Sequence, residues 1–256
     1  MATTPVTTTK IYKPAMLVGQ VYARAYGATT PHIPIGNVLT LELEHSEDVI
    51  TQEDMTKLGG GTYAEVRRVK EVAIKMELAD LNTTNLQRAL LGTSATVAGA
   101  TVTGEEHTVA LGGLVRLKHI GAKSVVVKKD VLDVPTPVNA EGNFEVRPEG
   151  IFILPNAKDL ADNEEITVDY TFASYTTIEA LTTKSAELDL VFAGLNEADG
   201  GNPVMVEIFR ASQGVSKSLA LITGNEFATL EVEGNVLQDP TKSGTGVSRY
   251  YKTSMV

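Results

Sequence analysis

The four histidines are the residues of this chain best suited to metal binding or acid–base catalysis, but their spacing favours neither. His32, His45, His107 and His119 lie far apart, and no two of them form an HxxxH zinc motif. Histidines isolated in this way are typical of surface or core positions. The chain has no cysteine, which excludes disulfides, thiolate metal sites and a thiol nucleophile.

Other motifs that could support chemistry are incomplete. The glycines at 59–61 are followed by Thr62, Tyr63 and Ala64 instead of Gly-Lys-Ser/Thr, which indicates a flexible loop base and not a phosphate-binding loop. A GxSxG nucleophile elbow is absent. Neighbouring acids lack the alternating spacing of a calcium-binding loop, as at Glu47/Asp48, Glu53/Asp54 and Glu164/Glu165. The sequence therefore predicts a non-enzymatic protein with no catalytic, cofactor-binding or metal-binding residues.

Composition and charge narrow the function further. The 256 residues are 43% hydrophobic and 21% charged, as expected of a globular protein with one large or two small domains. The formal net charge of −10 argues against a basic phosphate-binding surface, and the absence of Trp weakens any case for base stacking. No run approaches the ~20 apolar residues of a membrane span. The N-terminal MATTPVTTTK lacks the pattern of a secretory signal and predicts a polar arm.

Three strands are predicted in the first third of the chain. Apolar and polar residues alternate over Val72–Leu78, which indicates a strand with one buried and one wet face. Gln20–Tyr26 and Val38–Glu44 are predicted to be strands as well, the second with Leu39, Leu41 and Leu43 on one face. Between the strands Val38–Glu44 and Val72–Leu78, the segment Ser46–Gly61 is polar and ends in three glycines, which predicts a long projecting loop.

A short helix is predicted directly after the strand Val72–Leu78. Asp80 or Asn82 can cap its N-terminus, and the helix is expected over Asn82–Leu91. Leu86 and Leu90 share one face and are predicted to pack on the sheet, because a single helix of about ten residues cannot form its own core. Gly92 is predicted to end the helix in a left-handed conformation.

The middle of the chain differs in pattern from both ends. Residues 93–175 contain short β-rich runs separated by turn residues, which predicts an inserted small β-sandwich with strands at Val109–Lys118, Ser124–Val131, Phe144–Leu154 and Glu165–Phe172. Further strands are then expected at Glu187–Phe192, Val204–Arg210, Leu219–Ile222 and Phe227–Val232, the first two joined by a hairpin turn at Asp199–Gly201. Residues 1–15 and 239–256 are expected to be extended arms.

Several runs resemble the major tail tube proteins of long-tailed (siphovirus-like) bacteriophages. EVAIKMELADLNTTNLQRALLG is similar to the strand–helix signature of that family, and VFAGLNEADGGNPVMVEIFRA, FATLEVEGNVLQD and PTKSGTGVSRYYK are similar to its final hairpin and C-terminal arm. ITVDYTFASY is similar to the end of the insertion in longer members. The resemblance covers most of the chain in order, although no single motif is diagnostic.

The resemblance implies a mainly β fold, the tail-tube β-sandwich/barrel with one short α-helix packed on the sheet. Residues 1–92 and 176–256 would form the tail tube domain, and 93–175 an external β subdomain. It also implies a structural virion protein, made in the bacterial host cytoplasm, whose usually hexameric rings stack into the hollow tube for DNA delivery. Its partners would be its own copies, the tape measure, terminator and distal tail proteins, and DNA in transit without specific binding.

Two sets of residues follow from that implication. Glu42, Glu44 and Glu77 are candidates for a lumen-facing surface that repels phosphate, although the same wet face could look outward. The loop Ser46–Gly61 corresponds to the one that reaches the next ring in this family, which makes candidate inter-ring residues of Glu47, Asp48, Glu53, Asp54 and Lys57.

Two alternatives remain open at this level. A tail terminator or baseplate ring protein would share the same fold, and the sequence does not separate them from a tube protein. A carbohydrate- or cell-surface-binding β-sandwich is the alternative from another class. It would need clustered exposed aromatics, for which a chain with 5% aromatic residues gives little support.

Overall fold

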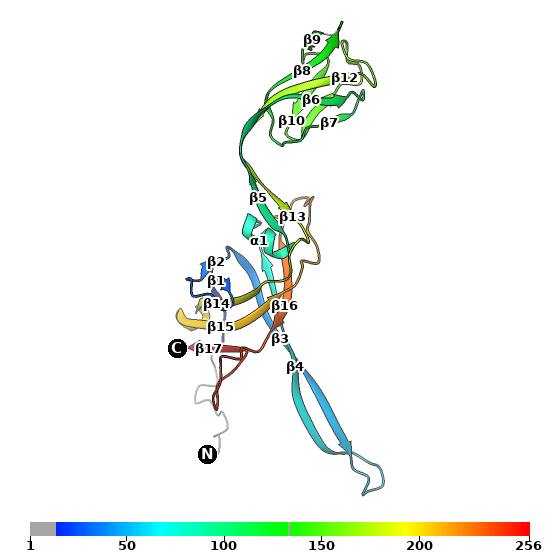
Figure 1. The fold of residues 1–256 in the computed structure, drawn as a ribbon. Coiled ribbons are helices and arrows are strands. Elements are labelled where there is room, and N and C mark those ends of the chain that lie inside the picture. The colour runs from blue at the N-terminus through cyan, green and yellow to red at the C-terminus, as the bar shows by residue number, and fades with distance from the viewer. Residues whose placement is uncertain (1–13, 133) are drawn as a thin grey trace. The chain divides into compact units, whose positions relative to one another are not determined.

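A computed structural model describes residues 14–132 and 134–256, so the predicted arm at 1–15 lies almost wholly outside the described residues. The chain divides into two compact units. The main unit runs to Thr93 and resumes at Ile178, and the inserted unit is Ser94–Thr177. Both are built from antiparallel sheets, so the protein is mainly β with one short α-helix in the part described (Figure 1).

The main unit contains one eight-stranded sheet. Its strands run in the order β2-β1-β14-β15-β16-β4-β3, and β17 pairs with β15 beside this path. The elements of this unit are β1 (Leu17–Ala25), β2 (Ile33–Pro34), β3 (Val38–Glu53), β4 (Thr62–Leu78), α1 (Thr83–Ala89), β14 (Glu187–Asn196), the 3₁₀ turn η1 (Glu197–Asp199), β15 (Asn202–Gln213), β16 (Leu230–Val236) and β17 (Tyr251–Met255).

The alternating pattern of β4 forms the centre of the core. Val72, Ile74, Met76 and Leu78 are all less than 7% exposed, which confirms the face predicted from the sequence. These side chains pack with those of β1, β14, β15 and β16 in one apolar cluster. Burial of apolar surface on this scale is the main stabilising term available to the unit.

The leucines predicted to share a face of the neighbouring strand are buried to different degrees. Leu41 and Leu43 of β3 pack against the core, but Leu39 is 52% exposed. The pairing of β3 with β4 shifts register between Val38 and Thr40, and Leu39 lies in this irregularity. It still lines one cavity with Leu41 and Leu43.

The helix begins as expected but buries different residues. The Asn82 side chain accepts a hydrogen bond from the backbone N–H of Asn85 at 2.9 Å, which confirms the predicted cap. The buried residues are Asn85 and Ala89, whereas Leu86 and Leu90 are only half-buried, so the predicted packing face is wrong. In a helix of seven residues, the short side chains of Asn85 and Ala89 allow neighbouring segments to approach closely, and the Asn85 amide can bond to the backbone around it.

The helix end also differs from the prediction. Leu91, not Gly92, adopts the left-handed conformation, with φ of 48°. Gly92 is required for a different reason, because a Cβ there would lie 2.7 Å from the carbonyl oxygen of Glu179. Its N–H donates to the Gln87 carbonyl at 2.8 Å.

The C-terminal half of the main unit contains one confirmed turn and two errors of prediction. The hairpin of β14 and β15 turns at Gly200 and Gly201, both with positive φ, as predicted. The expected strand Leu219–Ile222 is absent, because this segment is irregular. The expected C-terminal arm folds back, since residues 251–255 form β17 on the sheet and Asp239 is buried.

The inserted unit is a small sandwich of two sheets. One sheet has the order β6-β12-β8-β9 and the other β10-β11-β7, and a single apolar cluster joins them. The strands are β6 (Ala100–Thr108), β7 (Leu114–Arg116), β8 (Lys123–Val131), β9 (Val134–Pro137), β10 (Phe144–Arg147), β11 (Gly150–Ile153) and β12 (Glu165–Phe172). β5 (Thr93–Val97) pairs with β13 (Tyr175–Glu179) at the start and end of the insertion.

The sequence predicted only part of this sandwich. The expected strand Glu165–Phe172 is β12, but Val109–Lys118 shortens to β7 and Phe144–Leu154 is a hairpin of two strands. Gly150 begins the second strand of this hairpin with a φ of 156°, and a Cβ there would lie 2.2 Å from the Val115 carbonyl oxygen on the neighbouring β7. The strand β6 was missed because its polar run ATVTGEEHT has no apolar alternation.

Candidate functional site: an exposed strand arm and two surfaces of the main sheet

The predicted loop at Ser46–Gly61 is instead the outer part of a long two-stranded hairpin, which corrects the sequence interpretation. β3 continues to Glu53, and β4 begins at Thr62. We define the arm as residues 46–71, where β3 and β4 pair with each other from Ser46↔Glu71 outward and no third strand from the described residues joins them. The arm extends beyond the rest of the main unit (Figure 1).

Neither face of the arm is covered. Every residue of the arm is exposed except Asp54, which is half-buried. The exposed residues include Val49 (42%), Ile50 (52%), Val66 (51%) and Val69 (53%) on the strands, with Met55 and Leu58 more exposed still at the tip. A two-stranded ribbon is marginally stable alone in water, so these apolar side chains are available to a partner protein.

Charged side chains pair along the arm. Arg67 contacts Glu47 at 3.1 Å and Glu65 at 2.5 Å, and these carboxylates raise the pKa of its guanidinium. At the turn, Asp54 accepts hydrogen bonds from the Thr56 hydroxyl at 2.5 Å and the Thr56 N–H at 2.9 Å, which lower the pKa of the carboxyl group. The turn therefore has local order of its own.

The polar face at the base of the same hairpin is acidic. Glu42 and Glu44 of β3 lie opposite Lys75 and Ala73 of β4, and the Lys75 ammonium donates to Glu44 at 2.7 Å. Glu77 lies opposite Glu231 of β16. We define the acidic face as Glu42, Glu44, Glu77, Glu231 and Glu233, with Lys75 among them.

The outer edge of β3 is open. Among the described residues β3 pairs only with β4, so the second side of this sixteen-residue strand has no hydrogen-bonded neighbour. The part of β3 that precedes the arm and the strand β1 line one apolar cavity of about 490 Å³, with Leu41, Leu43 and Val21 in its wall. An unpaired strand of this length is a template for pairing with another chain.

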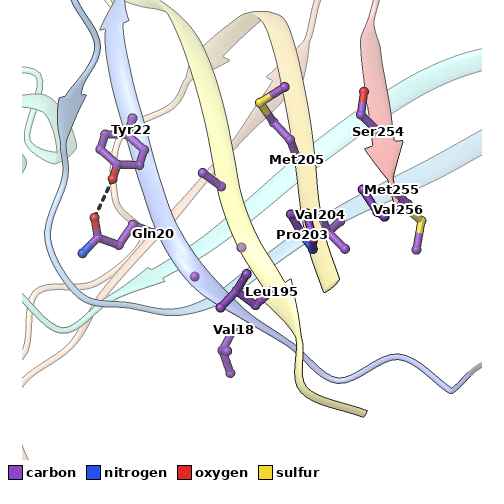
Figure 2. Close-up of a pocket in the computed structure, with 13 residues that line it drawn as sticks. Val18, Gln20, Tyr22, Leu195, Pro203, Val204, Met205, Ser254, Met255 and Val256 are labelled. Atoms are coloured by element: carbon purple, nitrogen blue, oxygen red, sulfur yellow. Dashed lines mark hydrogen bonds between the residues drawn. The ribbon is translucent and has the colours of Figure 1, made fainter. Parts of the chain in front are cut away.

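A second apolar surface lies on the face of β1, β14, β15 and β17 opposite the core. Figure 2 shows Val18, Leu195, Pro203 and Met205 around a groove of about 680 Å³, which the last residues of β17 also line. Polar atoms are few here, and the Tyr22 hydroxyl donates to Gln20 at 2.6 Å within the groove wall. We call this surface the outer groove. Its composition suits protein contact better than binding of a polar small molecule.

The inserted unit holds a half-buried carboxylate whose hydrogen-bond partners lie within the unit. Glu105 accepts hydrogen bonds from the Tyr170 hydroxyl at 2.5 Å and the Lys118 N–H at 2.9 Å, and it lies 2.8 Å from the His107 ring. Burial alone would raise the pKa of Glu105, but these hydrogen bonds outweigh it and the pKa is lowered. Burial and the bond to Glu105 raise the pKa of Tyr170. The arrangement is structural, because its polar atoms are satisfied within the unit.

A family model described as "Protein of unknown function UCP028589" matches residues 14–254. The chain belongs to this family. No curated protein matches the chain.

The predicted site residues of this UCP028589 family member lie in two places. Glu47, Asp48 and Glu53 lie on β3 within the arm, and Asp54 and Lys57 lie in its turn. Glu42, Glu44 and Glu77 share the acidic face, which the structure extends with Glu231 and Glu233. The alternation of Leu230, Val232 and these two acids in β16 was the signal that could have found them.

Two further observations bear on other kinds of site. Within the described ranges, no group of three or more His, Asp or Glu residues is arranged to hold a metal ion. Within the same ranges, the helix is too short and too polar to cross a bilayer.

Proposed function

We propose that this protein is the structural subunit of a bacteriophage tail tube, which assembles into rings that stack into a hollow tube for DNA delivery. The sequence resemblance to tail tube proteins first suggested this function. The observation that carries it furthest is the arm, in which the outer parts of β3 and β4 are exposed on both faces.

The arm has little reason to be stable as an isolated element. Its residues 46–71 contribute nothing to the apolar core, and its valine and isoleucine side chains stay in water. Contact with the next ring would bury these side chains and supply partners for the exposed strand edge. The arm therefore takes the place of the loop in the original hypothesis, with the same expected role between rings.

The free edge of β3 supports closure within a ring. A head-to-tail contact joins one surface of a subunit to a different surface of the next, and it closes when the rotation per subunit divides a full turn. Pairing of β3 with another edge of the neighbouring sheet would continue the main sheet from subunit to subunit. Edge strands such as β17, which pairs only with β15 among the described residues, are available for this.

The acidic face supports a role as the inner wall. Its five carboxylates are accompanied by Lys75 and by Lys217, which pairs with Glu233 at 2.6 Å, so the surface is acidic overall. Carboxylates repel DNA phosphates over roughly a Debye length, about 8–10 Å at physiological salt. A wall of this kind would let DNA pass without binding it.

Electron microscopy of the purified protein tests the proposal directly. We expect long tubes of uniform diameter when the protein is concentrated. Short rings alone would favour a tail terminator or baseplate ring protein, and a persistent monomer would contradict the proposal.

A second experiment tests the role of the arm. Ser46 pairs with Glu71, so replacing residues 47–70 with Asn-Gly would close the strands through a two-residue turn. We expect a folded, soluble subunit that no longer elongates, and hydrogen exchange in the wild type that slows in the arm upon assembly. Long tubes from the shortened protein, or an arm already protected in the monomer, would contradict this role.

The inserted unit is expected to be external and dispensable for ring closure. Replacing Ser94–Thr177 with a short linker removes a unit that has its own core. Rings or tubes should still form. Loss of soluble protein would instead show that the main unit depends on the insertion.

A further inference from the structure

A basic pocket of about 330 Å³ lies beside the C-terminal end of α1 in the main unit. Helix α1 and the segment before β14 provide its two cations, Arg88 and Lys184. Thr84 and Thr183 also line the pocket, and none of the described lining residues is an Asp or Glu. A pocket with two cations and no acid is unusual in a chain with a net charge of −10.

Arg88 is the unexplained residue of this pocket. Its side chain is half-buried, and burial lowers the pKa of the guanidinium. A guanidinium has five N–H donors, and those of Arg88 have no hydrogen-bond or ion-pair partner among the described residues. Partial removal of a charge from water costs free energy unless another group compensates for it.

Arg88 is not needed to satisfy the end of the helix. The carbonyl of Ala89 accepts from Ser216 N–H at 2.7 Å, and that of Leu90 accepts from Leu181 N–H at 2.9 Å. The Leu91 carbonyl accepts from Thr183 N–H, also at 2.9 Å. Backbone donors thus occupy the carbonyls that an arginine in the last turn could otherwise cap.

We propose that the basic pocket binds a carboxylate side chain from a second copy of this chain. This inference rests on the proposed self-assembly. The planar guanidinium can hold a carboxylate through two parallel hydrogen bonds, and Lys184 adds a second charge beside it. The donors of Arg88, which have no protein partner among the described residues, would then find an acceptor in the assembly.

A neighbouring copy is the favoured source because it carries exposed, unpaired carboxylates. Asp48 and Glu53 of the arm are exposed and have no side-chain partner among the described residues. A free anion such as phosphate has the same charge chemistry and is the other source that the experiment must separate.

The first test compares Arg88→Gln with Arg116→Gln. Arg116 is exposed on β7 in the inserted unit and serves as the matched control. We expect Arg88→Gln to slow assembly about tenfold or more, because loss of a hydrogen bond to a charged group changes a binding constant by about that factor. Arg116→Gln should assemble like the wild type. The melting temperature of the Arg88→Gln subunit should not fall, because no partner is lost within the subunit.

The outcomes separate this inference from the proposed function. The inference is overturned if Arg88→Gln assembles at the wild-type rate or if the melting temperature of its subunit falls. The proposed function still stands in that case, provided that the wild type forms tubes. If the wild type never assembles, both fail. If inorganic phosphate raises the melting temperature of the wild type but not of Arg88→Gln, and assembly of both is equal, the pocket binds a free anion instead.

Zero-length cross-linking gives a readout that does not depend on a variant. An equal mixture of ¹⁵N-labelled and unlabelled wild type is assembled and treated with a carbodiimide, which joins Lys184 to a carboxylate in contact with it. We expect cross-linked peptides with one labelled and one unlabelled member, which identify the acid on the second copy. Assembled tubes in which Lys184 forms no such peptide would overturn the proposal.

Discussion

The base and the arm of the β3–β4 hairpin are made by the same two strands but differ in everything except their pairing. At the base, β16 joins β4 and the apolar side chains of Val72–Leu78 are buried. In the arm, the ladder continues with no third strand from the part of the chain that the structure describes, and isoleucine and valine lie in water. Hydrogen-bonded pairing is therefore common to both regions, and burial is what separates them.

The difference teaches where each region obtains its stability. The base gains from burial of apolar area, at ~25 cal/mol per Å². The arm has only its ladder and a few exposed ion pairs, which contribute little in water. We therefore expect changes in the base to alter subunit stability and changes in the arm to alter assembly.

The largest effect on the subunit should come from Ile74→Ala. Ile74 is 3% exposed at the centre of the core, so its truncation leaves a cavity and should cost about 2–5 kcal/mol. Urea denaturation monitored by circular dichroism measures this loss. A loss no greater than that of a surface substitution would mean that the base is not packed as described.

Asn85→Ala should have the next largest effect, because a buried amide anchors the helix beside the base. The Asn85 side-chain nitrogen donates to the Ile35 carbonyl at 2.7 Å and the Asp80 carbonyl at 2.9 Å. Leaving these acceptors without a donor should cost about 1–3 kcal/mol. Gln52→Ala, at an exposed amide in the arm, is the control and should leave the unfolding midpoint unchanged.

Charge gives a third form of the comparison. Asp239 is 5% exposed near the end of β16. Burial would raise the pKa of its carboxyl group, but hydrogen bonds from Thr241 and from Tyr26 outweigh burial and lower it. A lowered folded pKa means that the carboxylate stabilises the subunit above the ordinary Asp pKa of ~3.9 and that this contribution is lost as the pH falls further.

Asp239→Asn should consequently lower the melting temperature at neutral pH and have a smaller effect near pH 3. Asp54→Asn is the matched change in the arm turn, where Thr56 is the one hydrogen-bond partner of the carboxyl group in the described ranges. We expect it to shift the melting temperature of the subunit little at any pH. Thermal unfolding measured from neutral to acidic pH distinguishes the two, and equal shifts would remove the distinction between the regions.

Ile50→Ala should have the smallest effect on the subunit. It repeats the Ile74 truncation in the arm, where the side chain is 52% exposed, and should change stability by less than about 0.5 kcal/mol. Tube formation, followed by light scattering, should nevertheless slow if the arm packs on a neighbouring ring. Unchanged assembly would show that Ile50 lies outside the contact.

The sequence predicted the strand over 72–78 because one face is buried and the other is wet, and such burial leaves a period of two. It missed the strands of the arm for the complementary reason. SEDVITQE and TYAEVRRVKE form strands with both faces exposed. Because neither face packs on a core, apolar and polar residues do not alternate in these strands. The three glycines before Thr62 indicated that the chain turns there, but they did not show that the turn is short and joins two long strands.

The amino-acid sequence by itself determined the features that depend on neighbouring residues. These are the buried face of β4, the Asn82 cap, the Gly200–Gly201 turn and the boundaries of a β-rich insertion near residues 93 and 175. The tertiary structure alone decided which residues far apart in the chain meet. It placed Glu231 beside Glu77, brought β17 onto β15, and buried Asn85 and Ala89 instead of Leu86 and Leu90. The reason is that register and burial are set by packing against distant strands, and spacing along one segment does not contain that information.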